Sequence, residues 1–257
     1  MRDLLEDLEQ GTANPMDAAQ RAMRPALPKR FYKEASVGER DGQFVLLLDG
    51  KLARTPARNV LAAPSRSLME AVAAEWNALG ETIDPALMPL TRLMNVAIDR
   101  VAGEAEAVAA EAAKYAGSDL LCYRAGNPAE LAAAQAAAWD PVLDWIRETY
   151  GARFALAEGV TFIEQPQESV DTIRAEVARY APPFALAALA TVTAITGSVL
   201  LALALARGRL SADEAWTAAH VDEQWNASQW GEDSEAMRRL ATRRAEFGAA
   251  AKVLAAV

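Results

Sequence analysis

Cysteine and histidine each occur only once in the 257 residues, as Cys122 and His220. A single cysteine excludes an intramolecular disulfide and a multi-thiolate metal site, and it is typical of a protein in a reducing compartment. A single histidine excludes a two-histidine zinc site, and also a di-iron centre that takes a Glu-x-x-His motif from each of two helices. We therefore expect no metal site.

Phosphate-binding and catalytic motifs are also missing. The sequence contains no Gly-x-x-x-x-Gly-Lys-Ser/Thr loop, no Gly-x-Gly-x-x-Gly turn, no Gly-x-Ser-x-Gly elbow and no His-Glu-x-x-His. Cys122 and His220 would together make a thiolate nucleophile. However, the run Leu120-Leu121-Cys122-Tyr123 is typical of a buried segment in which cysteine acts as a small hydrophobic residue. We expect neither a cofactor nor an enzyme.

The charge balance excludes a further class of partner. Acidic residues outnumber basic ones 35 to 26, which gives a formal net charge of -9. Such a potential repels phosphate backbones and anionic lipids, so we expect no nucleic-acid partner. The first thirty residues contain several acids and resemble neither a secretory signal nor a transit peptide. This favours the cytoplasm, and the excess of arginine over lysine indicates a GC-rich bacterial genome.

One uncharged stretch, residues 181–206, is long enough to cross a bilayer. Two prolines, two threonines and a Thr196-Gly197-Ser198 sequence interrupt it, and alanine supplies much of its apolar character. A helix buried on all sides shows the same pattern. We expect such a helix, bent or broken at Thr196-Gly197-Ser198, and no stable membrane insertion; a membrane anchor is the alternative.

The N-terminal third predicts a small sheet. Residues 1–28 are polar and contain Gly and Pro breakers, so we expect a flexible arm with at most one short helix. The apolar run Phe44–Leu48 predicts a strand, and Asp49-Gly50 predicts a tight turn into a partner strand over Lys51–Thr55. A helix that begins at Ser65 should cover this sheet, with Leu68, Val72, Trp76 and Leu79 on its buried face.

A second helix carries two stripes. Leu90, Leu93, Ala97 and Val101 form an apolar stripe, and Thr91, Asn95 and Asp99 form a polar stripe beside it. The polar stripe has two interpretations. It ties the helix to a neighbouring loop, or it lines a pocket between helix and sheet in a small-molecule-binding protein or enzyme.

The remainder of the chain predicts helices. Asp140-Pro141 is typical of a helix start, and residues 154–162 suggest a small hairpin. A capping box at Ser211–Glu214 begins a helix to about Ser228, and a last helix follows Gly231. The predicted fold class is therefore α+β, with a small N-terminal β-rich domain over residues 29–85 and a larger all-helical domain over residues 86–257.

The most unusual feature is an acidic segment. Between Arg209 and Arg238 there are seven acids, no lysine or arginine, and three of the six tryptophans. Of these, Trp216 and Trp225 are nine positions apart and cannot face the same side of one helix. Aromatic anchors beside acids are typical of a surface that binds a basic protein partner. A solvated helix whose tryptophans pack on neighbouring elements explains the pattern equally well.

Several short motifs, in order along the chain, resemble the ATP12 family. They are Lys29-Arg30-Phe31-Tyr32, Leu48-Asp49-Gly50-Lys51-Leu52 with Thr55-Pro56, Glu75-Trp76, Met88-Pro89-Leu90-Thr91 with Asn95 and Asp99, Asp119-Leu120-Leu121-Cys122-Tyr123-Arg124, Trp139-Asp140-Pro141, and Asp222-Glu223 followed by Trp230-Gly231. The resemblance runs from about residue 29 to the C-terminus. It is to the bacterial form of the family.

The resemblance implies an assembly chaperone of the F1 part of ATP synthase. Such a protein binds the unassembled α subunit and shields its β-facing surface until the hexamer forms, without being an ATPase. The resemblance also implies an important acid at Asp222-Glu223 and a structural role for Trp76. Together with the acidic segment, it gives a predicted partner-binding set of Asp222, Glu223, Trp225, Trp230, Glu232 and Asp233. We expect a monomer when the protein is free.

Overall fold

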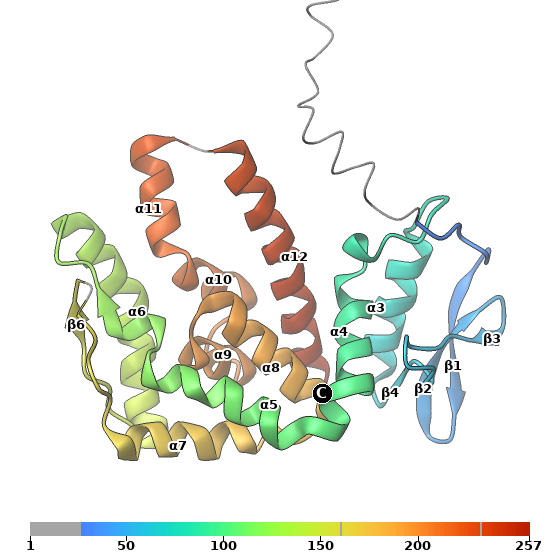
Figure 1. Ribbon diagram of the computed structural model, residues 1–257, viewed down its shortest axis with the longest axis horizontal. Coiled ribbons are helices and arrows are strands. Elements are labelled where there is room, and N and C mark those ends of the chain that lie inside the picture. The colour runs from blue at the N-terminus through green and yellow to red at the C-terminus, as the bar shows by residue number, and fades with distance from the viewer. Residues whose placement is uncertain (1–26, 160, 232) are drawn as a thin grey trace, which may run out of the picture.

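The computed structural model describes residues 27–159, 161–231 and 233–257 (Figure 1). The predicted arm over residues 1–28 therefore lies almost entirely outside the described part. Short strands come first and helices make up most of the remainder, so the predicted α+β class is confirmed.

The N-terminal strands form an antiparallel sheet. They are β1 (Ala35–Arg40), β2 (Gln43–Leu48), β3 (Lys51–Leu52) and β4 (Ala62–Ala63). β2 pairs with each of the other three. The turn at Asp49-Gly50 has φ angles of 48° and 77°, the pair of left-handed conformations that a two-residue hairpin turn requires. That turn was predicted correctly, but its return strand β3 is shorter than the Lys51–Thr55 expected.

The helix α3 (Arg66–Asn77) packs on this sheet as predicted. Ser65 caps it by accepting a hydrogen bond from the Leu68 N–H at 3.4 Å. Leu68 and Val72 are fully buried, whereas Trp76 is only partly buried at the edge of the core. Apolar side chains at this spacing are removed from water on one helical face, which fixes the helix on the sheet.

Helices form nearly all of the remaining chain. They are α4 (Pro89–Val96), α5 (Ala102–Lys114), α6 (Ala129–Tyr150), α7 (Gln167–Ala178), α8 (Pro183–Thr196), α9 (Val199–Ala206), α10 (Ala212–Ala219), α11 (Val221–Trp230) and α12 (Ser234–Ala256). The short connecting elements are the 3-10 turns η1 (Pro85–Leu87), η3 (Tyr115–Gly117) and η4 (Leu120–Cys122), the π-helical turn η2 (Ala97–Val101), and the strands β5 (Tyr123–Arg124) and β6 (Ala157–Glu158).

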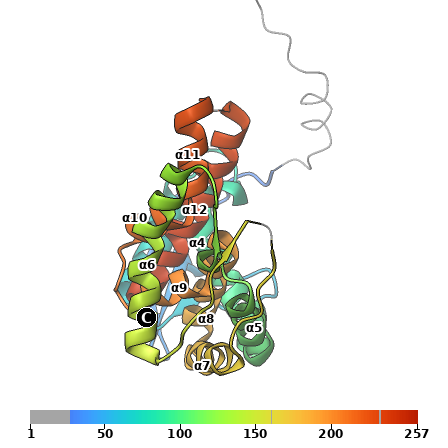
Figure 2. The ribbon, with the colours of Figure 1, turned by 90° about the vertical axis from the view of Figure 1, so that its left-hand side faces the viewer.

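The helices α8 and α9 form the centre of the helical region. They lie among α5, α6, α10 and α12, which pack around them (Figures 1 and 2). The predicted break is confirmed: Gly197 has a φ of 71°, and the Ser198 hydroxyl accepts from the Leu201 N–H at 3.0 Å to begin α9. The uncharged stretch is therefore a pair of buried helices. Among the described helices, none combines the length and apolarity that a membrane crossing requires.

A buried carboxylate sits at this break. Asp119 is inaccessible to solvent, and its two oxygens accept from the Leu121 and Leu200 N–H groups, each at 3.1 Å. Burial disfavours the charged form and outweighs these hydrogen bonds, so the pKa of Asp119 is raised to about 6. The bond to Leu200 ties the start of α9 to the turn that precedes β5.

Three local predictions were wrong. Pro141 does not begin a helix but lies inside α6, which starts at Ala129; the helix continues because Trp139, Val142 and Ile146 are buried on either side of the proline. Among the described residues of 154–162, the strand β6 pairs in parallel with the distant β5 and not with a neighbouring strand as in a hairpin. The helix expected to run to Ser228 is broken at His220 into α10 and α11.

The hydrophobic core is continuous from the sheet to the C-terminal helix. Buried residues of α3, α4, α8, α9 and α12 belong to one cluster, and α12 contacts both α3 and α4. A division into domains at residue 85 stays a prediction.

Candidate protein-binding surface

The base of the acidic segment belongs to the core. Trp216 on α10 is 4% exposed, stacks on His220 with ring centroids 3.8 Å apart, and meets Phe247 of α12 edge-on at 5.3 Å. The Nδ1 atom of His220 lies 2.8 Å from the Trp216 carbonyl oxygen. These buried side chains hold α10 against α12 and leave no room for a partner.

The single cysteine is also buried. Cys122 is inaccessible, and burial together with the nearby Asp119 raises the pKa of its thiol to about 12. A thiol with such a pKa is protonated at neutral pH and is a poor nucleophile. This agrees with the interpretation of Cys122 as a small hydrophobic residue.

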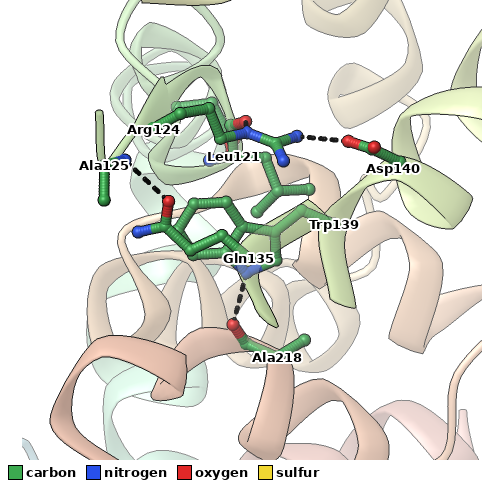
Figure 3. A network of polar contacts seen from close by, with 8 residues as sticks. Leu121, Arg124, Ala125, Gln135, Trp139, Asp140 and Ala218 are labelled. Carbon is green, nitrogen blue, oxygen red and sulfur yellow. Dashed lines mark hydrogen bonds and ion pairs between the residues drawn. The ribbon is translucent and has the colours of Figure 1, made fainter. Parts of the chain in front are cut away.

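A polar network fixes the segment that carries α11 against α6 (Figure 3). The Trp139 Nε1–H donates to the Ala218 carbonyl at 2.6 Å, just before the break at His220. Arg124 lies over the Trp139 ring at 5.1 Å and pairs with Asp140 at 2.8 Å. A buried tryptophan N–H with a hydrogen-bond partner defines one position for the neighbouring backbone, so the start of α11 is well fixed.

Asp222 joins this network. Gln135 donates from Nε2 to the Asp222 carboxylate at 2.7 Å and accepts from the Ala125 N–H at 2.7 Å. Gln135 is buried, whereas Asp222 is only partly buried in the first turn of α11. The second carboxylate oxygen of Asp222 has no hydrogen bond to any described residue, so it remains free for a partner.

After Asp222, most side chains along α11 are exposed to solvent. Glu223 and Asp233 are exposed, Trp225 is partly buried, and Trp230 at the end of α11 is 83% exposed. Asp233 caps α12 by accepting from the Glu235 N–H at 3.0 Å. Glu232 belongs to the predicted set but lies outside the described residues. The described members of the set thus extend from the base of α11 to its tip.

The fold neutralises part of the acidic segment. Asp213 pairs with Arg244 at 2.7 Å, and Glu235 pairs with Arg239 at 2.7 Å, both from α12. Glu214 is used in the capping box with Ser211, whose hydrogen bonds lower the pKa of that carboxyl. The seven charges are therefore not all uncompensated as the sequence suggested, and Asp222, Glu223 and Asp233 are the described acids left at the surface.

The polar stripe on α4 and η2 has internal partners. The Thr91 hydroxyl donates to Glu75 at 2.6 Å and accepts from the Trp76 Nε1–H at 3.1 Å. Asp99 accepts from three groups of the loop over residues 55–59. Asn95 is partly buried, and its Oδ1 atom has no partner among the described residues. These contacts support the structural interpretation of the stripe rather than the small-molecule pocket.

Sequence reasoning missed the role of Glu75. Its carboxylate accepts from the Leu90 N–H at 2.9 Å and from the Thr91 N–H at 2.8 Å, so a residue of α3 caps the first turn of α4. The available signal was Pro89 at the start of α4, after a residue that cannot cap by its side chain. Trp76 lies next to this cap, and its structural role stays a prediction.

The described side chains form no group of three or more His, Cys, Asp or Glu that would hold a metal ion. What they do form is a projecting pair of helices, α11 and the first half of α12, that carries acids and an exposed tryptophan (Figure 1). Surfaces of this kind are typical of proteins that bind other proteins.

Comparisons with known proteins agree with that class. The family model for the ATP12 chaperone protein matches residues 29–147. The crystal structure of Atp12 from Paracoccus denitrificans superposes with a TM-score of 0.80 and a sequence identity of 39%. The match covers 88% of this chain and 97% of the Paracoccus chain. The Atu1473 protein of Agrobacterium tumefaciens is 48% identical, covers 100% of this chain and 97% of its own, with a TM-score of 0.85.

A more distant relative is the mitochondrial protein atp12 of Schizosaccharomyces pombe. It is 23% identical over 215 residues, which are 79% of this chain and 74% of the yeast protein. The chain belongs to the ATP12 family of chaperone proteins, as its motifs predicted.

Proposed function

We propose that this protein is an assembly chaperone for the F1 part of ATP synthase. It binds the unassembled α subunit, covers the surface that later meets the β subunit, and is released when the hexamer forms. It works in the cytoplasm as a monomer, without a cofactor and without catalysing a reaction. Membership of the ATP12 chaperone family supports the general role, and the surface on α11 supports a protein partner.

The exposed Trp230 is the observation that carries the proposal. A tryptophan that is 83% exposed leaves a large apolar area in water, which is unfavourable unless a partner covers it. Asp222, Glu223 and Asp233 lie on the same helix or at its end and give this apolar anchor an acidic surround. Such an arrangement takes an apolar surface that is bordered by basic residues.

Release of the client from this surface does not require a chemical reaction. A projecting pair of helices buries a modest area on a client, so its affinity is limited. The permanent contact between α and β subunits is larger and replaces it by mass action. This explains how a chaperone without a phosphate-binding loop gives up its client.

The direct test is a stoichiometric mixture of this protein with the purified free F1 α subunit. We expect a complex in gel filtration and suppression of α-subunit aggregation measured by light scattering. If the mixture gives neither a complex nor protection, the proposal is wrong.

Two variants and one control locate the surface. Trp230→Ala should weaken the complex about tenfold or more, while Phe162→Ala, which removes another exposed aromatic ring (69% exposed), should change the affinity less than twofold. Asp222→Asn keeps the acceptor for Gln135 and removes only the charge, so it tests the acid without breaking the network. Equal affinities of Trp230→Ala and Phe162→Ala would place the client elsewhere.

A further inference from the structure

A second run of charge, opposite in sign, lies on the sheet. Between Asp49 and Glu70 the sequence contains four basic residues and no acid. These residues are Lys51, Arg54, Arg58 and Arg66, and all four are exposed. Three of them, Lys51, Arg54 and Arg58, belong to β3 and the loop that follows it; we call these three residues the basic loop. It is a local positive surface on a protein of net charge -9.

The backbone behind the basic loop is held by one carboxylate. Asp99 accepts from the Thr55 hydroxyl at 2.6 Å, the Ala57 N–H at 3.0 Å and the Asn59 Nδ2 at 2.9 Å. Partial burial of Asp99 works against the charged form, but these hydrogen bonds outweigh it and lower the pKa of the carboxyl. The π-helical turn η2 carries Asp99 to this loop, and such turns are frequent at functional sites.

Arg58 is held in an unfavourable backbone conformation. Its φ is 68°, a left-handed value that costs a residue other than glycine free energy. The Arg58 N–H donates to the Thr55 carbonyl at 2.9 Å, and Arg54 donates from Nη1 to the Arg58 carbonyl at 2.8 Å. These contacts maintain the turn and hold the Arg58 backbone in one position.

The side chains of the basic loop form no ion pair. No described carboxylate lies within ion-pair distance of Lys51, Arg54 or Arg58. The Asp99 carboxylate behind the loop is occupied by its hydrogen bonds to residues 55, 57 and 59. Three exposed positive charges on a fixed backbone are therefore available to a partner.

We propose that the basic loop is a second docking surface, and that its occupant is an acidic segment of the client polypeptide. This inference rests on the proposed function, because it assumes a protein client. Charge complementarity supports it: the net charge of -9 repels extended polyanions such as nucleic acid and anionic membranes. A few carboxylates on a protein surface carry no such long-range repulsion and pair well with arginine.

The position of the loop adds to the argument. In Figure 1, β3 lies at one end of the long axis of the molecule, and α11 lies toward the other end. A client that contacts both surfaces must be as large as a folded domain. Two separated contacts of opposite charge also fix the orientation of such a client, which one contact does not.

The test uses the full-length protein and the free F1 α subunit. Arg58→Gly removes the side chain and suits the left-handed backbone, so the variant should unfold at a temperature no lower than the wild type. We expect its dissociation constant for the α subunit to rise about fivefold at low salt, and that of Arg58→Glu about tenfold or more. The matched control is Lys252→Glu, which makes the same charge change at an exposed position on α12 and should alter the affinity less than twofold.

Loss of affinity in both Arg58 variants, reduced in size at high salt and absent in Lys252→Glu, supports the basic loop as a docking surface. If Arg58→Gly and Arg58→Glu bind like the wild type, or if Lys252→Glu weakens binding equally, the inference is wrong while the proposed function stands. If the wild type itself does not bind the α subunit, the proposed function is wrong and this inference falls with it.

Discussion

Glu75 of α3 caps the N-terminus of a different helix, α4. A helix normally receives its cap from the residue that precedes it, but here the carboxylate of α3 reaches the first N–H groups of α4. The Trp76 indole N–H binds the same Thr91 hydroxyl that donates to Glu75. These two adjacent side chains therefore join the helix that covers the sheet to the first helix after it.

Replacing Glu75 should destabilise the fold. Glu75→Ala leaves two backbone N–H groups and the Thr91 hydroxyl without their acceptor, and we expect a loss of about 2 kcal/mol in the free energy of unfolding. Glu75→Gln keeps one acceptor and should lose about half as much. Urea unfolding followed by circular dichroism measures both. Glu70→Ala, an exposed change on the same helix, is the control; equal losses for Glu70→Ala and Glu75→Ala would refute the capping role.

The buried Asp119 makes stability depend on pH. Its pKa in the folded protein, about 6, is above its ordinary value of 3.8. A group of this kind contributes stability that is complete below pH 4 and is lost as the pH rises through 6. The Asp119→Asn variant has no carboxyl group at this position, so this pH dependence is absent from it. We expect its stability relative to the wild type to rise by about 2 to 3 kcal/mol between pH 4 and pH 7.

Chemical denaturation of both proteins at several pH values measures this difference. Comparison with the variant cancels the contribution of every other carboxylate, since those titrate in both proteins. A difference that stays constant between pH 4 and pH 7 would show that the buried carboxyl keeps its ordinary pKa.

At the scale of the element, α6 tolerates a proline that its own hydrogen bonding disfavours. Pro141 has no N–H to donate to the carbonyl four residues earlier, and a proline in a helix interior costs about 3 kcal/mol. Pro141 is exposed, while Trp139 and Val142 beside it are buried. The buried neighbours hold the helix together across the proline.

Pro141→Ala should therefore stabilise the protein. The alanine restores the missing N–H donor, and we expect the free energy of unfolding to rise by about 1 to 2 kcal/mol, because the greater freedom of the unfolded chain offsets part of the gain. Thermal unfolding measures the change. A lower unfolding temperature for Pro141→Ala would mean that the helix needs the proline at this point.

The elements that the sequence predicted correctly have local signals. The break between α8 and α9 follows from Gly197 and Ser198, and the β2–β3 turn follows from Asp49-Gly50, because these residue types determine backbone angles by themselves. The wrong predictions depend on distant contacts. Pro141 looked like a helix start because its packing partners were not visible, and β6 pairs with a strand more than thirty residues earlier.

The site was predictable to a similar degree. The run of acids could be read from the sequence, and the spacing of Trp216 and Trp225 showed that the two cannot share a face of one helix. The spacing did not decide between exposed and packed tryptophans, and the exposure of Trp230 comes from the structure. The ion pair between Glu235 and Arg239 has the i, i+4 spacing that predicts it. The pairing of Asp213 with Arg244 could not be predicted, because it joins residues 31 positions apart. Gln135 gave no signal at all, because its contact with Asp222 joins residues 87 positions apart.

At the scale of the whole molecule, an acidic surface and a basic surface lie well apart. The acidic surface on α11 and the basic loop on the sheet both face solvent. Surface charges act mainly on the rate of association, and salt screens them over about 10 Å at 0.1 M. We expect the association rate with the free α subunit to fall at least tenfold between about 0.02 and 0.5 M sodium chloride, with a smaller change in the dissociation rate.

Stopped-flow tryptophan fluorescence or surface-immobilised binding gives these two rates separately. Glu223→Lys and Arg58→Glu should each flatten the salt dependence of association. If the association rate is the same at both salt concentrations, charge does not guide the encounter, and apolar contact at Trp230 would have to account for it.

The pair formed by α11 and the start of α12 touches the body only at its base. From Glu223 to Ala245 most described side chains face water, so amide hydrogens there should exchange by local opening well before those of α8 and α9. Asp233 caps α12 and Glu235 pairs with Arg239, so the fold uses these two acids. It makes no such use of the exposed Glu223 and Trp230. Under the proposed function, exchange of these two residues for small neutral ones over generations would leave folding unchanged and weaken only the binding of the client.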